Sequence, residues 1–271
     1  MENENIERLL DAIYNKYKYD FRYYSKDSIN RKINLVLNKL GCKTILELQN
    51  KILCEPTSFS ILLEFLSVHI SEMFRDPSYF LYIRENIIPI LKTYSSLKIW
   101  IAGCSTGEEV YSMAILLKEE GILDRSIIYA TDNNTKVLKK AESGIFRLED
   151  IQKFTINYQK AGGKHEFSDY YTAAYDHAIF DKTLKKNIIF TDHCLSTDSV
   201  FSEIQFISCR NVLIYFEQKL QDRAFQLFYD SLCPSGILGI GPVETVNFSK
   251  YNEVFVPLSS ADRIYSKRKI L

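Results

Sequence analysis

Two strand-like segments, each followed at once by a helix-like segment, constrain this chain more than any other feature of its sequence. LKIWIAG at 97–103 is typical of a short buried strand, and STGEEVYSMAILLKEEG at 105–121 is typical of a helix. The pattern repeats with RSIIYATD at 125–132 and NTKVLKKAESG at 134–144. Strands and helices that alternate in this way form parallel sheets with right-handed crossovers. The sequence therefore predicts an α/β fold.

Later segments extend this pattern and add two departures from it. The expected elements are a strand at 204–210, a long helix at 217–232, a strand at 236–241 and an antiparallel edge strand, ADRIYSK, at 261–267. Residues 146–190 are rich in Tyr and Phe and do not fit the strand–helix alternation. We expect them to form an inserted antiparallel β subdomain with a turn at Gly162-Gly163.

The first 75 residues have a different character. Apolar residues recur there at helical spacing in four segments, and few alternating β-branched runs occur. We expect the second helix to begin near Ser25 or Asp27 and to end at Gly41. The predicted organisation is thus an N-terminal helical domain at 1–75, a linker at 76–96 and a ligand-binding α/β domain at 97–271.

Composition excludes several classes of protein. Lys+Arg and Asp+Glu both total 34, so a nucleic-acid binder that relies on bulk charge is disfavoured. No apolar run approaches the length of a membrane span, and the polar start MENENIERLL does not resemble a signal peptide. The six Cys form no CxxC pair, which favours reduced thiols over disulfides or a zinc site. We expect a cytoplasmic protein, monomeric by default, with no metal and no membrane insertion.

The turn after the first strand is the first candidate for a ligand site. Gly103 and Gly107 bracket it, and glycine lets a ligand approach the backbone closely. Glu108 and Glu109 follow in the first helical turn, where they suit the helix dipole but repel a pyrophosphate. A ligand with a cationic ammonium or sulfonium fits better. The alternative is an ordinary strand–helix turn with two N-terminal acids.

Asp132, at the end of the second strand, is the second candidate. An acid in this position can accept hydrogen bonds from both hydroxyls of a ribose. The alternative is that Asp132 only caps the next helix. Together with the glycine turn, Asp132 favours a nucleoside ligand, and the absence of GxGxxG disfavours a dinucleotide.

Two further segments end in polar or charged residues. ISEMFRDPSYF at 70–80 places Arg75 among apolar and aromatic residues, where it could meet a carboxylate of a substrate or ligand, or simply pair with Asp76. FISCRNVLIYF at 206–216 ends a strand in Cys-Arg-Asn. Asn211 could hydrogen-bond a ligand there, and Tyr215 could orient a reacting group.

These segments together resemble the chemotaxis receptor methyltransferase family, CheR. The resemblance rests on the helical N-terminal domain, GCSTGEE-YS, ATD, RNVLIYF and PSGILGIGPVE, in the order and spacing of the family. It implies a Rossmann-like methyltransferase sheet and S-adenosyl-L-methionine as cofactor, with S-adenosyl-L-homocysteine as product. The implied reaction is methylation of glutamate side chains on the cytoplasmic helical domain of chemoreceptors.

The resemblance also implies roles for individual residues. The implied catalytic residues are Arg75 and Tyr215. The implied cofactor-binding residues are His69, Ser71, Arg75, Gly103, Glu108, Glu109, Asp132, Cys194, Leu195, Asn211 and Val212, with the choice between the two glutamates left open. The sequence departs from the family where His69, Ser71 and Met73 stand for Asn, Thr and Phe, where Cys194 stands for Asn, and where Asn134 stands for an acid.

Receptor docking is implied for two surfaces. Residues 14–43 contain eight basic and two acidic residues, and such a patch would attract an acidic helix and make activity sensitive to salt. The alternative is a solvated helical face. Tyr170, Tyr171 and Tyr175 in the expected β subdomain could add a peptide strand at its edge, as in the family's docking of receptor tails, or could pack on the main sheet.

Three other functions remain open. The departures at His69 and Cys194 motivate a cofactor-binding signalling module with weakened or lost catalysis. The same fold could methylate a carboxylate of another protein, or a small molecule. A dinucleotide-dependent dehydrogenase is disfavoured by the acidic first turn and the missing GxGxxG.

Overall fold

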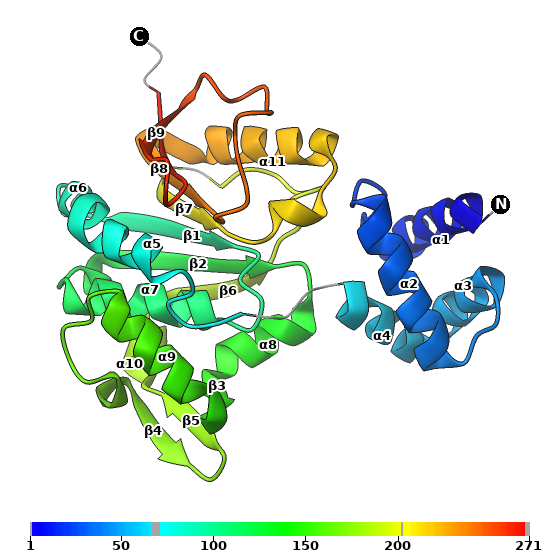
Figure 1. Cartoon of the computed structure of the whole chain (residues 1–271), viewed down its shortest axis with the longest axis horizontal. Helices are drawn as coiled ribbons and strands as arrows, with labels where there is room; N and C mark the ends of the chain where they lie inside the picture. The colour runs from blue at the N-terminus through cyan, green and yellow to red at the C-terminus, as the bar shows by residue number, and fades with distance from the viewer. Residues whose placement is uncertain (1, 67–70, 202, 269–271) are drawn as a thin grey trace.

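The computed structural model describes residues 2–66, 71–201 and 203–268. Its first part is a helical unit whose apolar stripes pack into a core of their own, built mainly from Ile, Leu and Phe side chains. The helices are α1 (Glu2–Tyr17), α2 (Lys26–Leu40), α3 (Ile45–Cys54) and α4 (Pro56–Leu66). Gly41 ends α2 in the left-handed conformation, as expected, because glycine has no Cβ to oppose it. Figure 1 shows this unit beside the main sheet.

The second part contains a seven-stranded sheet of order β6-β2-β1-β7-β8-β10-β9. The five parallel strands are β1 (Leu97–Ala102), β2 (Ser126–Asp132), β6 (Ile188–Asp192), β7 (Ile204–Cys209) and β8 (Leu232–Ile240). Strand β10 (Ile264–Lys267) pairs antiparallel with both of its neighbours, β8 and the edge strand β9 (Phe255–Ser259). The predicted mostly parallel sheet with an antiparallel last strand is confirmed.

Alternate side chains of β1 enter two separate cores, because successive residues of a strand face opposite sides of the sheet. Ile99 and Ile101 pack with α7 (Glu108–Glu119), whereas Trp100 packs with α11 (Gln218–Ser231). Helix α8 (Thr135–Ser143) follows β2. Figure 1 shows α7 and α11 on opposite faces of the sheet.

A separate three-stranded antiparallel sheet of order β3-β5-β4 confirms the predicted inserted β subdomain. Its strands are β3 (Ile145–Arg147), β4 (Tyr171–Ala174) and β5 (His177–Phe180), accompanied by α9 (Leu148–Lys160), η3 (Phe167–Tyr170) and α10 (Lys182–Lys185). Tyr170 is buried, whereas Tyr175, between β4 and β5, is 99% exposed. The hairpin points away from the main sheet at the bottom of Figure 1.

Several details differ from the sequence-based expectations. Residues 76–96, expected as a linker, are mostly helical: α5 (Pro77–Tyr82), η1 (Ile83–Ile87) and α6 (Ile88–Leu91) bury most of their apolar side chains in the core of the main domain. Gly162 and Gly163 follow α9 instead of forming a hairpin turn. Residues 188–190 belong to β6 of the main sheet, because they pair in parallel with β2. Strand β10 is internal, and β9 forms the edge.

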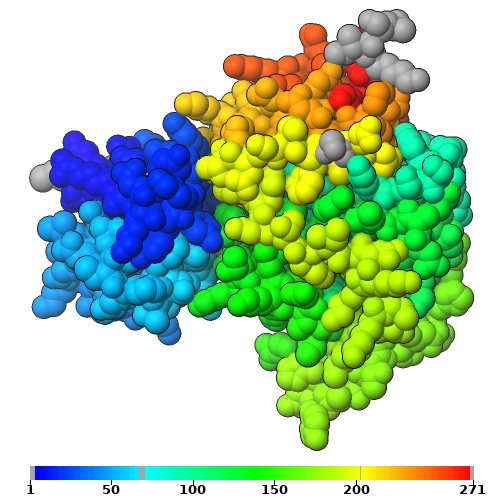
Figure 2. All heavy atoms as spheres, turned by 180° about the vertical axis from the view of Figure 1, so that it is seen from behind, coloured from blue at the N-terminus to red at the C-terminus, as the bar shows by residue number. Residues whose placement is uncertain are grey.

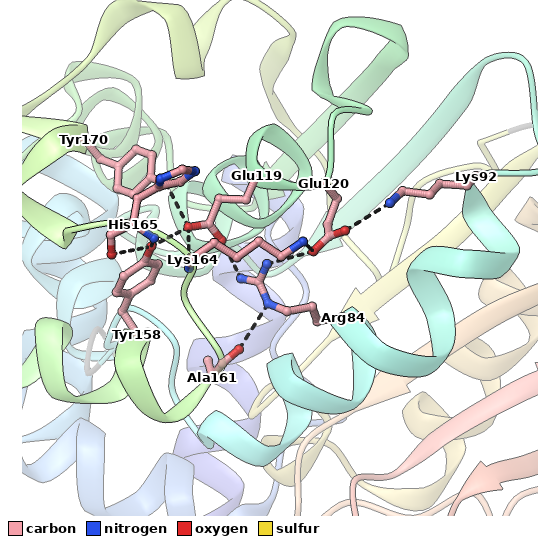
Figure 3. Close-up of polar contacts among 9 residues, drawn as sticks. All are labelled: Arg84, Lys92, Glu119, Glu120, Tyr158, Ala161, Lys164, His165 and Tyr170. Carbon is pink, nitrogen blue, oxygen red and sulfur yellow. Dashed lines mark hydrogen bonds and ion pairs between the residues drawn. The ribbon is translucent and has the colours of Figure 1, made fainter.

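A polar network connects the end of α7 to the β subdomain (Figure 3). Arg84 donates to Glu119 at 2.6 Å and to Glu120 at 2.9 Å, and its guanidinium is almost fully buried. Glu119 also accepts hydrogen bonds from the hydroxyls of Tyr158 and Tyr170. Although burial raises its pKa, these bonds and the amide of Lys164 lower it overall. The network fixes the subdomain on α7 and η1.

No helix in the described ranges is long and apolar enough to cross a bilayer.

Candidate functional site

The carboxyl ends of β1, β2 and β7 meet beneath a cavity. In an open parallel sheet this edge is where ligands bind, since the loops that leave neighbouring strands part there. With its open mouth included, the cavity has a volume of about 1030 Å³. It is lined by residues from all three strand ends and from the N-terminal helical unit, including Phe21, Tyr24, Ser71, Arg75, Gly103, Glu109, Asp132, Cys194, Leu195, Asn211, Val212 and Tyr215.

The glycine turn folds as it does because two positions exclude a side chain. Gly103 has φ +73°, and a Cβ there would lie 2.5 Å from a methyl group of Val212. Gly107 has φ +96°, and a Cβ there would lie 2.9 Å from that of Ala141. Backbone amides of Gly103 and Cys104 both donate to the carbonyl of Thr131 at 2.8 Å. The turn is therefore held against the end of β2, beside Asp132.

Asp132 organises two of the loops that line the cavity. One carboxylate oxygen accepts from the amide of Ser105 and the other from the amide of Asn134, both at 2.9 Å. Burial, together with the nearby Asp192, raises the pKa of Asp132 to about 6 in spite of these bonds. The cap of α8 is Asn134, whose side chain accepts from the amide of Lys136, so Asp132 is not needed for that purpose.

The structure distinguishes the two glutamates of the first helical turn. Glu109 lines the cavity, where it accepts from Ser208 Oγ at 2.5 Å and from Arg210 Nη1 at 3.1 Å. Glu108 is buried away from the cavity lining and accepts from Thr106 Oγ1 at 2.7 Å. Burial raises the pKa of Glu108. Of the pair, Glu109 is the one placed to meet a ligand.

Arg210 is a residue of the site that the sequence reasoning missed. Its side chain is 1% exposed and bridges Glu109 to Asp76, with 2.6 Å to the Asp76 carboxylate. It also donates to the carbonyl of Arg75 at 2.9 Å and lies 4.1 Å from the centre of the Tyr79 ring. The polar Cys-Arg-Asn triplet was the available signal, but only its Asn was given a role.

Arg75 and Tyr215 face the same cavity. The residues on either side of Arg75, Phe74 and Asp76, have φ of 52° and 55°, an unusual backbone of the kind found at binding sites. Burial raises the pKa of Tyr215, and the positive charges of Arg75 and Arg31 oppose this rise. The structure thus brings the two implied catalytic residues together.

The loop after β7 is fixed by a carboxylate that the sequence reasoning did not single out. Glu244 is 4% exposed. One of its oxygens accepts from the amides of Gly241 at 2.5 Å and Asn211 at 3.1 Å, and the other accepts from those of Val212 at 2.9 Å and Ile214 at 3.3 Å. Asn211 has φ 60°, which non-glycine residues seldom adopt. The signal was present as the last residue of PSGILGIGPVE.

The other implied residues have mixed outcomes. Ser71 lines the cavity and hydrogen-bonds Glu108, whereas His69 lies outside the described residues. Cys194 and Leu195 line the cavity. The Cys194 thiol lies 2.9 Å from Ser196 Oγ, and its amide donates to Asp198 at 2.9 Å.

Comparison with known proteins gives a consistent family. The protein-family model described as "CheR methyltransferase, SAM binding domain" matches residues 69–263. The family model described as "CheR methyltransferase, all-alpha domain" matches residues 4–67.

Individual relatives extend over nearly the whole chain. The chain is 53% identical over 262 residues to the Pseudomonas putida protein named "Putative methyltransferase Cher3", covering 97% of this chain and 96% of that one. It is 28% identical over 268 residues to the chemotaxis protein methyltransferase of Borreliella burgdorferi, covering 94% and 92%. Among solved structures, the N-methyltransferase NodS of Bradyrhizobium japonicum has a TM-score of 0.41 at 10% identity, covering 73% of this chain and 90% of that one.

Proposed function

Because the chain belongs to the CheR methyltransferase family and takes S-adenosyl-L-methionine as its cofactor, we propose that it methylates glutamate side-chain carboxylates of chemotaxis receptors. The observation that supports this most directly is the single cavity that joins Glu109 and Asp132 to Arg75 and Tyr215. Acids suited to a cationic nucleoside and groups suited to a carboxylate face the same space. We propose the cytoplasm as its place of action, because the helical segments it would modify lie there.

The cavity fits the cofactor. Among the described residues, Ser105, His193 and Arg210 each keep a buried side-chain polar atom without a hydrogen-bond partner, and all three line the cavity. Asp132 would accept hydrogen bonds from the ribose hydroxyls of the cofactor. Glu109 would meet the amino group of its methionine part, and Arg75 would meet the carboxylate of that same part. The rest of the cofactor would contact Asn211, Val212 and Leu195. When bound, the cofactor supplies a methyl group on a positively charged sulfur, which a carboxylate oxygen can accept to give a methyl ester and S-adenosyl-L-homocysteine.

No general base is required for this reaction. A glutamate side chain with a pKa of about 4.3 is already a carboxylate at neutral pH. Catalysis then depends on holding that carboxylate in position and excluding water, which can supply roughly 7–11 kcal/mol. We assign the orientation of the substrate carboxylate to Tyr215 and Arg75, which line the cavity and interact electrostatically.

Helix α2 is the proposed docking surface for the receptor. Its exposed Arg31 is close enough to Tyr215 for its charge to affect the pKa of that residue, so the basic face extends to the active site. Not all of the eight basic side chains in residues 14–43 are free to meet a receptor. Lys32 is buried, donates to the carbonyl of Leu66 at 2.5 Å and lies 4.7 Å from the centre of the Tyr215 ring. Arg22 pairs with Asp20 at 2.8 Å. Docking would therefore rely on the other basic side chains.

The β subdomain is the second proposed docking surface. Strand β4 lies at the edge of the three-stranded sheet, where an extended receptor tail could add a strand. Tyr175, in the turn between β4 and β5, is exposed, whereas Tyr170 is engaged with Glu119.

The direct test is incubation of the full chain with methyl-labelled cofactor and a cytoplasmic receptor fragment. A glutamate methyl ester releases volatile labelled methanol in mild base, and we expect this release to fall as salt concentration rises. A chain that binds the cofactor but releases no methanol would instead be the signalling module suggested by His69 and Cys194. Methanol release from other proteins but not from receptors would identify a different carboxyl substrate.

Replacement of Tyr215 with phenylalanine is expected to lower turnover at least about tenfold, because a hydrogen bond that orients the reacting groups is lost. Cofactor affinity should stay within about twofold, since the ring remains. Turnover is measured by methanol release and affinity by calorimetry. Tyr229→Phe, in α11, is the matched control and should change neither quantity. An equal loss of turnover and affinity in Tyr215→Phe would contradict this role.

Replacement of Glu244 with glutamine is expected to weaken cofactor binding about tenfold. The amide keeps one acceptor oxygen and points an NH2 group at two backbone amides, so part of the loop that carries Asn211 and Val212 is released. Calorimetry with S-adenosyl-L-homocysteine measures the change. Glu253→Gln, an exposed residue of the same connection, serves as control. Unchanged affinity in Glu244→Gln would show that the loop does not depend on this carboxylate.

A further inference from the structure

The N-terminal helical unit forms part of the cofactor cavity. Phe21 and Tyr24, in the connection between α1 and α2, line the cavity together with Asp132, Asn133 and Leu195 of the main domain. In Figure 2 the blue N-terminal helices lie directly against the yellow segment of the main domain. None of the sequence motifs places a residue of this connection in the site.

Backbone pairing holds this connection on the loop that carries Tyr215. The amide of Ser25 donates to the carbonyl of Tyr215, and the amide of Glu217 donates to that of Tyr23, both at 2.8 Å. Tyr24 and Phe216 form an isolated antiparallel bridge between these two bonds, and their ring centres lie 5.0 Å apart. Tyr24 is thus fixed by main-chain contacts as well as by its side chain.

The Tyr24 hydroxyl points to the ribose end of the cavity. It forms a hydrogen bond with the Asn133 side chain and lies near the carboxylate of Asp132. A tyrosine hydroxyl is protonated at physiological pH and can donate, and burial raises the pKa of Tyr24 further above its usual value. A flat aromatic ring with a donor beside Asp132 is well suited to a nucleoside.

We propose that Tyr24 is a binding residue for the nucleoside half of the cofactor, delivered to the site by the N-terminal helical unit. This inference rests on the proposed function, because it takes the cavity to be the cofactor site. Since the next residue, Ser25, occupies the N-cap position of α2, cofactor binding on Tyr24 also stabilises the position of the helix that is proposed to meet the receptor.

Calorimetry with S-adenosyl-L-homocysteine on the full chain tests the proposal. Tyr24→Phe is expected to bind about three- to tenfold more weakly, because one hydrogen bond is lost. Tyr24→Leu should bind at least about tenfold more weakly, because the aromatic surface is lost as well. Tyr14→Leu is the matched control: Tyr14 belongs to the same helical unit, and its ring lies under Arg22 at 3.8 Å instead of lining the cavity. Its affinity should stay within twofold of that of the native chain.

A measurement on the native chain covers the case in which a variant fails to fold. Hydrogen exchange at residues 21–25 and 215–217 should slow when S-adenosyl-L-homocysteine is added, while the middle of α1 should not change. If the native chain binds the ligand but these segments gain no protection, or if folded Tyr24 variants bind as tightly as the native chain, the proposal is wrong. If the native chain itself binds no S-adenosyl-L-homocysteine, it is the proposed function that fails.

Discussion

Replacement of Asp132 with alanine is expected to weaken cofactor binding by at least about a hundredfold. Two hydrogen bonds from ribose hydroxyls to a carboxylate are worth about 3–6 kcal/mol together. The substitution also leaves the amides of Ser105 and Asn134 without their acceptor, so the glycine turn and the start of α8 lose their common anchor. Calorimetry with S-adenosyl-L-homocysteine measures the loss.

The chain provides a matched control for this experiment. Asp192 ends β6 in register with Asp132 on β2, but it does not line the cavity. Asp192→Asn should therefore bind the cofactor within a few-fold of the native chain. If Asp192→Asn and Asp132→Ala lost affinity equally, the specific role of Asp132 would be refuted.

The carboxylate of Asp132 also predicts how cofactor binding depends on pH. Its pKa of about 6 lies above the usual value for aspartate, and hydroxyl donors favour the ionised form. The cofactor therefore binds best when the proton has left, so affinity should rise from pH 5 to pH 7 and then level off. Asp132→Asn, which cannot titrate, should flatten this part of the profile.

Replacement of Arg84 with methionine is expected to lower the free energy of unfolding by about 3–5 kcal/mol. Breaking a buried ion pair on one side leaves the opposite charge buried without the partner that offset its desolvation. Here two carboxylates, Glu119 and Glu120, both nearly inaccessible to solvent, lose their shared guanidinium (Figure 3). Denaturant unfolding followed by circular dichroism measures the effect.

Lys92→Met is the control for Arg84→Met, because Lys92 also pairs with Glu120, at 3.0 Å, but its side chain is 45% exposed. Exposed pairs contribute little, so the loss should stay below about 1 kcal/mol. Similar unfolding midpoints for the two variants would contradict the assignment of this network as a structural anchor.

Lowering the pH is expected to weaken the network of Arg84, Glu119 and Glu120. Against the effect of burial, hydrogen bonds from Lys164, Lys92 and Arg84 lower the pKa of Glu120 to about 2 from its usual 4.5. The stability contributed by a carboxyl with a lowered pKa is present above the unfolded value and is lost as pH falls through the folded value. The contribution of Glu120 should therefore decline between about pH 4.5 and pH 2.

The main sheet could be predicted because its strands are short apolar runs, each followed by a turn and a helix. Strands β1 and β2 and helices α7 and α8 lie where the pattern placed them. Periodicity also marked the four N-terminal helices. These features depend on local sequence, in which strand and helix have different periods.

Other elements depend on contacts between distant segments. Residues 188–190 form a short apolar run that suits either sheet, and only parallel pairing with β2 assigns it to the larger one. Helix α9 has Ile151, Phe154 and Tyr158 at helical spacing, but its aromatic content and the following Gly162-Gly163 favoured a hairpin. Residues 77–91 become core helices because the sheet offers an apolar face to cover.

The sequence alone determined the family, the parallel sheet and the types of residue in the site: acids after the glycine turn and the second strand, and an Arg, an Asn and a Tyr elsewhere. Only the tertiary structure decided which of them meet. Neighbouring residues of a helix point about 100° apart, so packing alone turned Glu109 toward the cavity and Glu108 away from it. Tyr24 and Glu244 reach the site through contacts with chain far away in sequence, and no local pattern encodes such contacts.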